Sequence, residues 1–123
     1  MIAKNIEEIA KGLSRLEQFG SDIIGTVVVN HNGLIVISNL PIDIDDRKFG
    51  AMVATLYKGM EMALESIKSP RIRHITVEFN NYQILALGIN ESLIVATLLH
   101  KDINFGLVLI ELEEFILKIK KNN

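Results

Sequence analysis

The chain has 123 residues, of which 49% are hydrophobic, and it carries a formal net charge of −2 at pH 7 with no cysteine. This length fits one domain, residues 1–123, and the near-neutral charge gives no field that would attract nucleic acid. Without cysteine, disulfides, thiolate nucleophiles and cysteine metal sites are excluded. A mean hydropathy of +0.30 is high for so small a domain, so we expect leftover apolar surface to contact a partner.

Residues 23–42 contain no Asp, Glu, Lys or Arg, and they are nominally as long as the roughly 20 residues that span a bilayer. The turn formers at residues 30–33 (NHNG) interrupt this segment, because their backbone groups need water. Charged residues, among them Lys4 and Glu7, occupy the region where the apolar part of a signal peptide would lie. We therefore expect no membrane span and a cytoplasmic protein.

The first third of the chain predicts a helix followed by two strands. Apolar residues spaced by three and four indicate an amphipathic helix over residues 2–19, which Gly20, Ser21 and Asp22 end. β-Branched runs predict strands over 23–29 and 34–38, and the turn at 30–33 joins them as a hairpin. Both runs are nearly continuous, so we expect both faces of these strands to be covered.

A long helix is predicted over residues 45–68, where Asp43, Asp45 and Asp46 can accept hydrogen bonds from its first N–H groups. A broad apolar stripe is expected to face the core. It comprises Phe49, Met52, Val53, Leu56, Met60, Ala63, Leu64 and Ile67. The opposite side is less polar than a solvent face should be, because Ala51, Thr55 and Met62 form a second, shallow stripe beside Lys58.

After Ser69 and Pro70, strands are predicted over residues 71–79, 82–87 and 93–99, followed by a helix over 104–121. Residues 71–79 alternate between apolar and polar side chains, which is typical of an edge strand. The element order α-β-β-α-β-β-β-α with short connections predicts an α/β (α+β) sandwich. We expect a five-stranded antiparallel sheet with helices on both faces, as in profilin-like folds.

No motif for phosphate binding, dinucleotide binding, zinc proteolysis or serine hydrolysis occurs in the sequence. The three histidines, His31, His74 and His100, share no metal-ligand spacing. The acidic pairs at 45–46 and 113–114 lie near helix starts, where capping and the helix dipole account for them. We therefore predict a protein that is not an enzyme, with no catalytic, cofactor-binding or metal-binding residue.

Four segments in this order resemble the Roadblock/light-chain-seven (Roadblock/LC7) domain family across nearly the whole chain. They are residues 24–34 (IGTVVVNHNGL), 38–41 (SNLP), 49–56 (FGAMVATL) and 104–108 (NFGLV). The resemblance implies homodimers or heterodimers, in which the strand after the long helix pairs across a two-fold axis and the long helices lie side by side. It also implies partners among Ras-like small GTPases, which relatives activate, assist in nucleotide exchange or hold on a platform; other relatives are dynein adaptors.

The sequence and the resemblance together predict a homodimeric regulator or scaffold that binds a Ras-like small GTPase. The expected dimer interface is the edge strand with two helix residues: Arg71, Ile72, Arg73, His74, Ile75, Thr76, Val77, Glu78, Phe79, Ala54 and Tyr57. The expected GTPase-binding residues are Arg47, Lys48, Ala51, Thr55, Lys58, Glu61 and Met62.

Several alternatives stay open at this point. Ala51, Thr55 and Met62 would pack only against the sister helix if no GTPase binds there. The fold class also fits a small-molecule sensor of the profilin or PAS type, because nearly continuous apolar strands can enclose a pocket. A dynein-type adaptor light chain and a heterodimer with another Roadblock-type protein are further alternatives.

Overall fold

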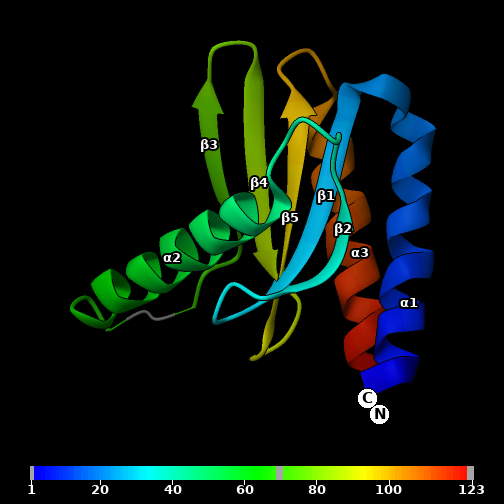
Figure 1. The fold of residues 1–123 in the computed structure, drawn as a ribbon. Coiled ribbons are helices and arrows are strands. Elements are labelled where there is room, and N and C mark those ends of the chain that lie inside the picture. Colours follow the sequence, from blue (N-terminus) through cyan, green and yellow to red (C-terminus); the bar gives the residue numbers. More distant parts are fainter. Residues whose placement is uncertain (1, 69–70, 122–123) are drawn as a thin grey trace.

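The computed structural model describes residues 2–68 and 71–121, and it contains three α-helices, one 3₁₀ helix and five strands (Figure 1). In chain order these are α1 (Ile2–Ser14), the 3₁₀ helix η1 (Arg15–Asp22), β1 (Ile23–Asn30), β2 (Ile35–Asn39), α2 (Asp46–Glu65), β3 (Ile75–Phe79), β4 (Tyr82–Gly88), β5 (Leu93–His100) and α3 (Phe105–Lys121). The predicted order of helices and strands is confirmed. Ser69 and Pro70, the predicted break after the long helix, lie outside the described residues.

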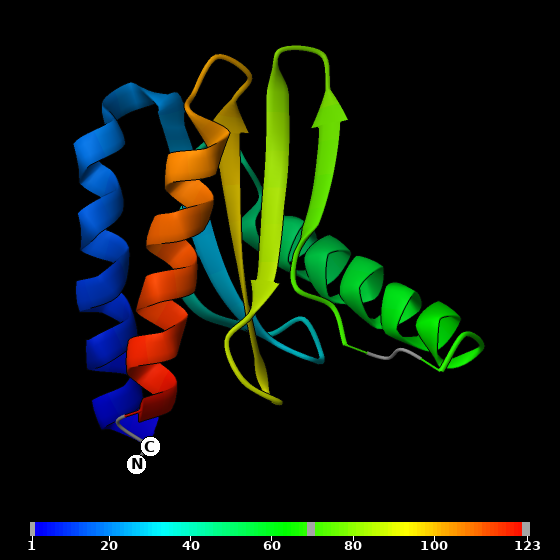
Figure 2. The same ribbon diagram turned by 180° about the vertical axis from the view of Figure 1, so that it is seen from behind.

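The five strands form one antiparallel sheet in the order β2-β1-β5-β4-β3. Helices cover both faces, with α1 and α3 on one and α2 on the other (Figures 1 and 2). The predicted fold class is therefore confirmed. The strand after the long helix lies at an edge of the sheet, as its alternating pattern indicates, and β2 forms the other edge.

The face under α1 and α3 holds the larger core cluster. Its fourteen buried residues come from α1, η1, α3, the inner strands and the connections after β4 and β5: Ile9, Leu16, Val28, Leu85, Leu87, Ile89, Val95, Leu99, Ile103, Val108, Leu112, Phe115, Ile116 and Ile119. The two helices approach closely at Gly12, where an added Cβ would lie 1.8 Å from Cδ1 of Phe115. The missing side chain at Gly12 thus makes room for the buried Phe115 ring.

α2 packs on the other face through a narrow line of residues, Gly50, Val53, Ala54 and Tyr57. At Gly50 the helix backbone comes close to the sheet, since an added Cβ would lie 2.7 Å from Cδ1 of Ile35. The predicted core stripe of α2 is wrong in its orientation. Val53 is buried, but Met52 and Met60 are 43% and 40% exposed and Ile67 is 66% exposed, because the helix rests on the sheet through its smaller residues.

Element boundaries differ from the predictions at two places. The first α-helix ends at Ser14 and continues as a 3₁₀ helix to Asp22, with Gly20 in a left-handed conformation at φ 60°. β3 begins at Ile75, so residues 71–74, which are predicted to be in this strand, lie outside it. Before it, Ile72 packs into the core under α2, and the Arg73 guanidinium lies 3.5 Å from the Glu113 carboxylate on α3. These contacts draw the chain away from the line of the sheet edge.

The predicted β1–β2 turn is confirmed, and of the three aspartates predicted to cap α2, Asp45 is the N-cap. The Asp45 carboxylate accepts hydrogen bonds from the backbone N–H groups of Arg47 and Lys48, at 3.1 and 3.2 Å, and so caps α2. In the β1–β2 hairpin the Asn30 side chain accepts hydrogen bonds from the N–H groups of Asn32 and Leu34. Within residues 2–68 and 71–121, no helix has the length and apolar character that a membrane crossing requires.

Candidate functional site

α2 is the element that leaves the body of the molecule. It packs on β1, β2 and β5, and its C-terminal half extends past the β3 edge of the sheet (Figures 1 and 2). Only Gly50, Val53, Ala54 and Tyr57 of this helix are buried. Both flanks of α2 are therefore open to a partner, and they differ in chemistry.

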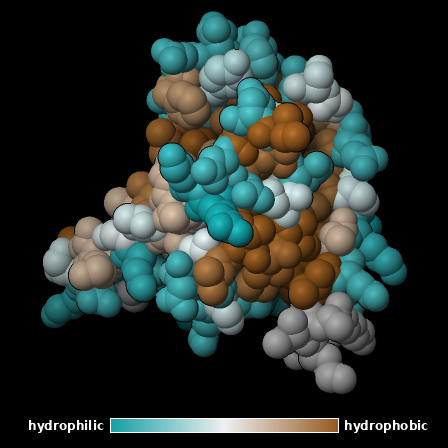
Figure 3. Space-filling view, viewed as in Figure 1, coloured by the Kyte–Doolittle hydropathy of each residue, from teal (hydrophilic) through white to brown (hydrophobic). Residues whose placement is uncertain are grey.

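One flank of α2 and the β3 end of the sheet present what we call the open apolar surface, defined by Met52, Leu56, Met60, Val77, Phe79 and Tyr82. Leu56 is half-buried, and the other five are 37–43% exposed. In the register of the sheet, Val77 pairs with Ile84 and Phe79 with Tyr82, so these side chains share the face on which α2 lies. Figure 3 shows apolar atoms at the surface of this face above α2.

The helix contributes to this surface with the flank that points away from the β1–β2 hairpin. The hairpin adjoins the opposite flank, since a Cβ on Gly33 would lie 3.1 Å from Cα of Ala51 and 3.6 Å from Cβ of Ala54. At about 100° per residue, Leu56 and Met60 lie on the other side of the buried line from Ala51. That side faces the end of the sheet at which the β3–β4 turn lies (Figure 1).

The hairpin-side and outer flank of α2 carries all seven residues expected to bind a GTPase. Six of them are exposed and Glu61 is half-buried: Arg47, Lys48, Ala51, Thr55, Lys58, Glu61 and Met62. Six of the seven thus lie on the outer side of one helix, whereas Glu61 lies nearer the sheet, beside Tyr57. The two positive charges of the first turn and Lys58 surround small side chains, and Met62 is 67% exposed. We call this set the polar α2 flank.

The residues expected at a dimer interface divide into three groups. In residues 71–75, Ile72 and Ile75 pack against the core under α2, and Arg73 pairs with Glu113. Thr76, Val77, Glu78 and Phe79 are exposed on the open edge of the sheet. Hydrogen-bonded and non-bonded pairs alternate along an antiparallel ladder, and the two-residue turn closes on the bonded pair Phe79 and Tyr82. The backbone groups of Thr76 and Glu78 therefore point away from β4, where a further strand can pair with them.

Ala54 and Tyr57 do not belong to that surface, which corrects the expectation from the sequence. They are 5% and 6% exposed because they pack against the sheet within the protomer. Burial raises the pKa of the Tyr57 phenol, the Glu61 carboxylate raises it further, and a hydrogen bond with the Gly88 backbone acts in the opposite direction. A Cβ at Gly88 would lie 2.6 Å from the Tyr57 hydroxyl oxygen, so this glycine makes room for that contact.

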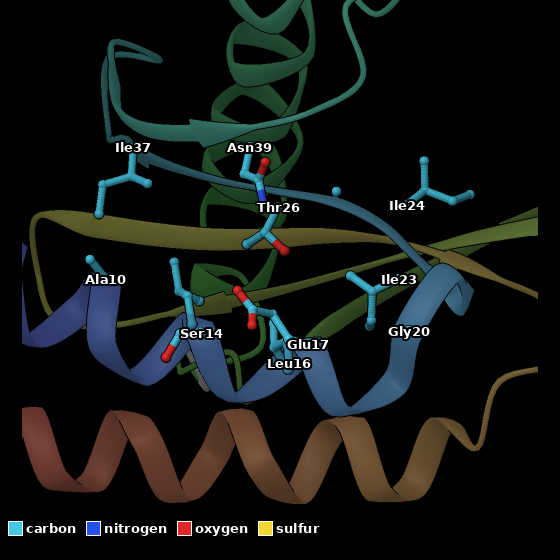
Figure 4. A pocket seen from close by; sticks show the side chains of 12 residues that line it. Ala10, Ser14, Leu16, Glu17, Gly20, Ile23, Ile24, Thr26, Ile37 and Asn39 are labelled. Atoms are coloured by element: carbon cyan, nitrogen blue, oxygen red, sulfur yellow. The ribbon is translucent and has the colours of Figure 1, made fainter.

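One hollow lies between the α1–η1 segment and β1 and β2, and has a volume of about 290 Å³ (Figure 4). The Glu17 and Thr26 side chains point into the space between η1 and β1, with Ile23 and Ile37 on its two sides. Glu17 is the only charged residue in its lining. A wider and more open hollow of about 540 Å³ is lined in part by His31, Tyr57, Glu61, Arg71 and Lys120. Its volume is in the range of ligand pockets, so the small-molecule sensor remains an alternative.

The histidines lie apart from one another. His31 approaches Tyr57, His74 approaches Phe105 and His100 approaches Tyr82, with ring centroids 6.3, 6.4 and 5.6 Å apart. Among the residues that the structure describes, no three His, Asp or Glu side chains gather as metal ligands would.

Sequence reasoning missed the contribution of Met52, Leu56 and Met60 to an exposed surface, because it assigned them to the core. The signal that could have identified them is the width of the apolar arc. With Val53, Tyr57 and Leu64 included, the arc is wider than the roughly 100° that one packed face requires. A helix with so wide an arc has apolar side chains for the core and for a second contact.

Comparisons with known proteins agree with this architecture. The model of the Roadblock/LC7 domain family matches residues 13–98. The chain is similar to protein MJ0714 of Methanocaldococcus jannaschii, with 25% identity over 120 residues that cover 98% of each protein.

Solved structures with the same fold have lower sequence identity. A Roadblock/LC7 domain from Streptomyces avermitilis superimposes with a TM-score of 0.78 at 14% identity, covering 89% of this chain and 92% of that one. MglB of Myxococcus xanthus gives 0.78 at 15% identity, covering 87% of both chains. Profilin II of Acanthamoeba castellanii gives 0.55 at 13% identity, covering 84% of this chain and 90% of that one, which supports the profilin-like description of the fold.

Proposed function

Because this chain belongs to the Roadblock/LC7 domain family, we propose that it is a homodimeric, non-enzymatic regulator or scaffold for a Ras-like small GTPase. The observation that carries the proposal is the pair of open flanks on α2. The apolar flank lies on the same sheet face as exposed residues of the β3 edge, and the polar flank points outward. One helix thus offers a surface for a second copy and a surface for a different protein.

The open apolar surface fits a second copy of the chain related by a two-fold axis. In such an isologous contact the same patch is used on both sides. The two unpaired β3 edges can therefore pair with each other while the two apolar α2 flanks cover apolar surface of the other copy. Pairing of the two β3 strands would give the outward backbone groups of Thr76 and Glu78 hydrogen-bond partners. The partner's α2 would then cover Met60 and Phe79, which are 40% and 41% exposed in the protomer.

Burial of these side chains supplies the driving force. Fully burying one large apolar side chain contributes about 1.5–3 kcal/mol, and a two-fold contact counts each residue twice. Met52, Met60, Val77, Phe79 and Tyr82 are each more than one third exposed, so a substantial part of that energy is still available. The exposed apolar side chains of this surface account for part of the high mean hydropathy of the sequence.

The polar α2 flank stays open in this arrangement, and the two-fold axis brings its two copies near one another. Arg47, Lys48 and Lys58 give the flank a positive character, while Ala51 and Thr55 let a partner approach the helix closely. A rim of charges around a small apolar centre is typical of transient protein interfaces. We assign the GTPase contact to this flank.

The test is a binding measurement with the Ras-like GTPases of the same cell, each loaded in turn with GTP and GDP. Changing Lys58 and Met62 together to Glu should lower GTPase affinity at least about tenfold, since it reverses one charge and places another at an exposed apolar contact. The mass of the unbound dimer should stay the same. A matched control is Leu107→Glu, which changes a 50% exposed apolar residue of α3, on the opposite face of the sheet, and should leave affinity unchanged.

Two outcomes contradict the proposal. If no Ras-like GTPase binds in either nucleotide state, the assigned partner class is wrong. If a GTPase binds and the Lys58→Glu, Met62→Glu double variant binds equally well, the polar α2 flank is not its site. Nucleotide hydrolysis and exchange, measured on the bound GTPase, then separate a regulator from a scaffold, which changes neither rate.

A further inference from the structure

α3 carries an apolar stripe on the side that faces solvent. Leu107, Ile110 and Leu117 are 50%, 51% and 60% exposed. The buried side of this helix is formed by other residues, Val108, Leu112, Phe115, Ile116 and Ile119. Figure 2 shows α3 in front of the sheet with its outer side uncovered by the other elements. This face is distant from the polar α2 flank and from the open apolar surface, since α2 lies on the opposite face of the sheet.

The spacing of the stripe is that of a helix-pairing seam. Leu107, Ile110 and Leu117 follow one another by three and seven residues, and Glu114 and Lys121 continue the same line. Alternating steps of three and four residues keep one narrow seam facing a partner helix. Isolated apolar side chains on a surface need no explanation, but three in one seam indicate a contact.

Charges beside the seam favour a particular partner. The middle of α3 is acidic at Glu111, Glu113 and Glu114, and its last turn is basic at Lys118, Lys120 and Lys121. Within the part of the chain that the structure describes, the only ion pair is Arg73 with Glu113, so Glu111 and Lys118 have no such partner. In an antiparallel copy, Glu111 of one helix would lie beside Lys118 of the other and attract it, whereas Glu114 would face its own copy across the two-fold axis.

We propose that α3 pairs with α3 of a second copy in an antiparallel, two-fold contact centred near Glu114. In this register Ile110 meets Leu117 of the other copy, and Glu111 of each copy lies beside Lys118 of the other. Flanking pairs of this kind set partner choice and direction in helix pairs. The contact goes beyond the proposed function, because it uses the opposite face of the sheet and joins two β3-paired dimers into a tetramer.

A lipid surface is the competing occupant, and the charges disfavour it. Helices that lie on anionic membranes carry Lys and Arg along their whole polar face. In α3 three glutamates stand in the middle of the helix, where they would be repelled by acidic headgroups.

The first test is the molecular mass in solution by sedimentation equilibrium. A contact made by one helix face lies below the roughly 1,200 Å² of stable interfaces, so we expect the larger assembly at about 100 µM and its dissociation on dilution. The Ile110→Glu, Leu117→Glu double variant should weaken this step about tenfold or more and halve the mass at high concentration. Leu34→Glu, at a similarly exposed apolar residue, should leave the mass unchanged.

A second test fixes the register of the contact. The chain has no cysteine, so Glu114→Cys introduces a single thiol at the centre of the seam. Under mild oxidation it should form a disulfide between two copies, and adding Ile110→Glu and Leu117→Glu should prevent the cross-link. Glu111→Lys alone should weaken assembly, and Glu111→Lys combined with Lys118→Glu should restore it, because the swapped charges again face each other.

The outcomes separate this inference from the proposed function. If the copies associate through α3 and not through β3, the unmodified chain is a dimer at high concentration. The Ile110→Glu, Leu117→Glu double variant is then a monomer. An equal mass for the double variant and the unmodified chain at every concentration overturns the α3 contact. Loss of binding to anionic phosphatidylserine vesicles in the double variant, with no change in mass, overturns it in favour of a lipid surface.

Discussion

The two faces of the sheet are covered to very different degrees. Under α1 and α3, fourteen buried residues from the helices, the inner strands and their connections form a continuous core. Under α2, the cluster has seven buried residues, and the β3 end of the same face exposes Val77, Phe79 and Tyr82 by 37–41%. The first face supplies the stability of the protomer, and the second keeps apolar surface for association.

The helices also pack differently on the two faces of the sheet. On the first face, Gly12 makes room for the Phe115 ring and locks two helices together. On the second face a single helix rests on Gly50, Val53, Ala54 and Tyr57, and half of its length extends past the sheet. Disruption of the first face should therefore unfold the protein, whereas disruption of the second should change its partners.

Gly12→Val should have the largest effect. Its Cβ would overlap the Phe115 ring, which is buried between two helices and the sheet and has little room to move. We expect a loss of about 3 kcal/mol or more in the free energy of unfolding, measured by urea denaturation. Gly106→Ala is the matched control, because its Cβ has only an ordinary contact at 3.7 Å, and it should be neutral or stabilising. Equal stability of Gly12→Val and the unmodified chain would mean that α1 and α3 pack differently.

Thr76→Pro should separate association from folding. Proline removes an N–H that points to the open edge of the sheet, where the protomer does not use it. The expected result is a monomer with unchanged far-ultraviolet circular dichroism, measured beside light scattering. Thr76→Val keeps the N–H and the β-branched side chain and should remain dimeric. A dimeric Thr76→Pro protein would contradict pairing through β3.

Met60→Glu and Met62→Glu compare the two flanks of α2 with the same substitution two residues apart. Met60→Glu places a charge on the open apolar surface and should weaken the dimer about tenfold or more, as measured by dilution. Met62→Glu lies on the polar α2 flank and should leave the dimer intact while lowering GTPase affinity. If both variants behave alike, the division of α2 into two functional flanks is wrong.

Tyr57→Phe should have the smallest effect, a loss of at most about 0.5–1.5 kcal/mol at pH 7, because it removes the phenol oxygen that approaches the Gly88 backbone. Because the pKa of Tyr57 is raised in the folded protein, its neutral form stabilises the fold below the unfolded pKa of about 10. That stability is lost as pH rises through the folded pKa. The unmodified chain should thus lose more stability than Tyr57→Phe above pH 10 in alkaline denaturation, and parallel curves would contradict this.

Local patterns in the sequence predict much of this fold. Asn30 and Gly33 indicate the first hairpin, Asp45 the start of α2, and the alternation over residues 71–79 an edge strand, which the structure has at 75–79. They cannot show which side of α2 meets the sheet, because the helix is apolar around more than half of its circumference. The close approach at Gly50 and Gly88 decides that orientation, and it depends on residues distant in sequence. Because the sequence does not show this orientation, Tyr57 is predicted at the surface, whereas it is buried in the fold.

Residues 71–73 show a second limit of prediction from local sequence patterns. Their alternating pattern favours a strand, but Ile72 packs under α2 and Arg73 pairs with Glu113 on α3, so the strand starts only at Ile75. The exposed residues of the polar α2 flank, in contrast, lie on one side of the helix, because residues spaced by three and four share a side whatever that helix packs on.

Hydrogen exchange at the backbone amides of Thr76 and Glu78 tests the central claim most directly. If β3 pairs with β3 of a second copy, both amides should be protected in the unmodified chain and should exchange rapidly in Met60→Glu at the same concentration. The β4 amides should stay protected in both proteins. Rapid exchange at Thr76 and Glu78 in the unmodified chain, at a concentration where it is a dimer, would show that the sheet edge is free and that the copies associate elsewhere.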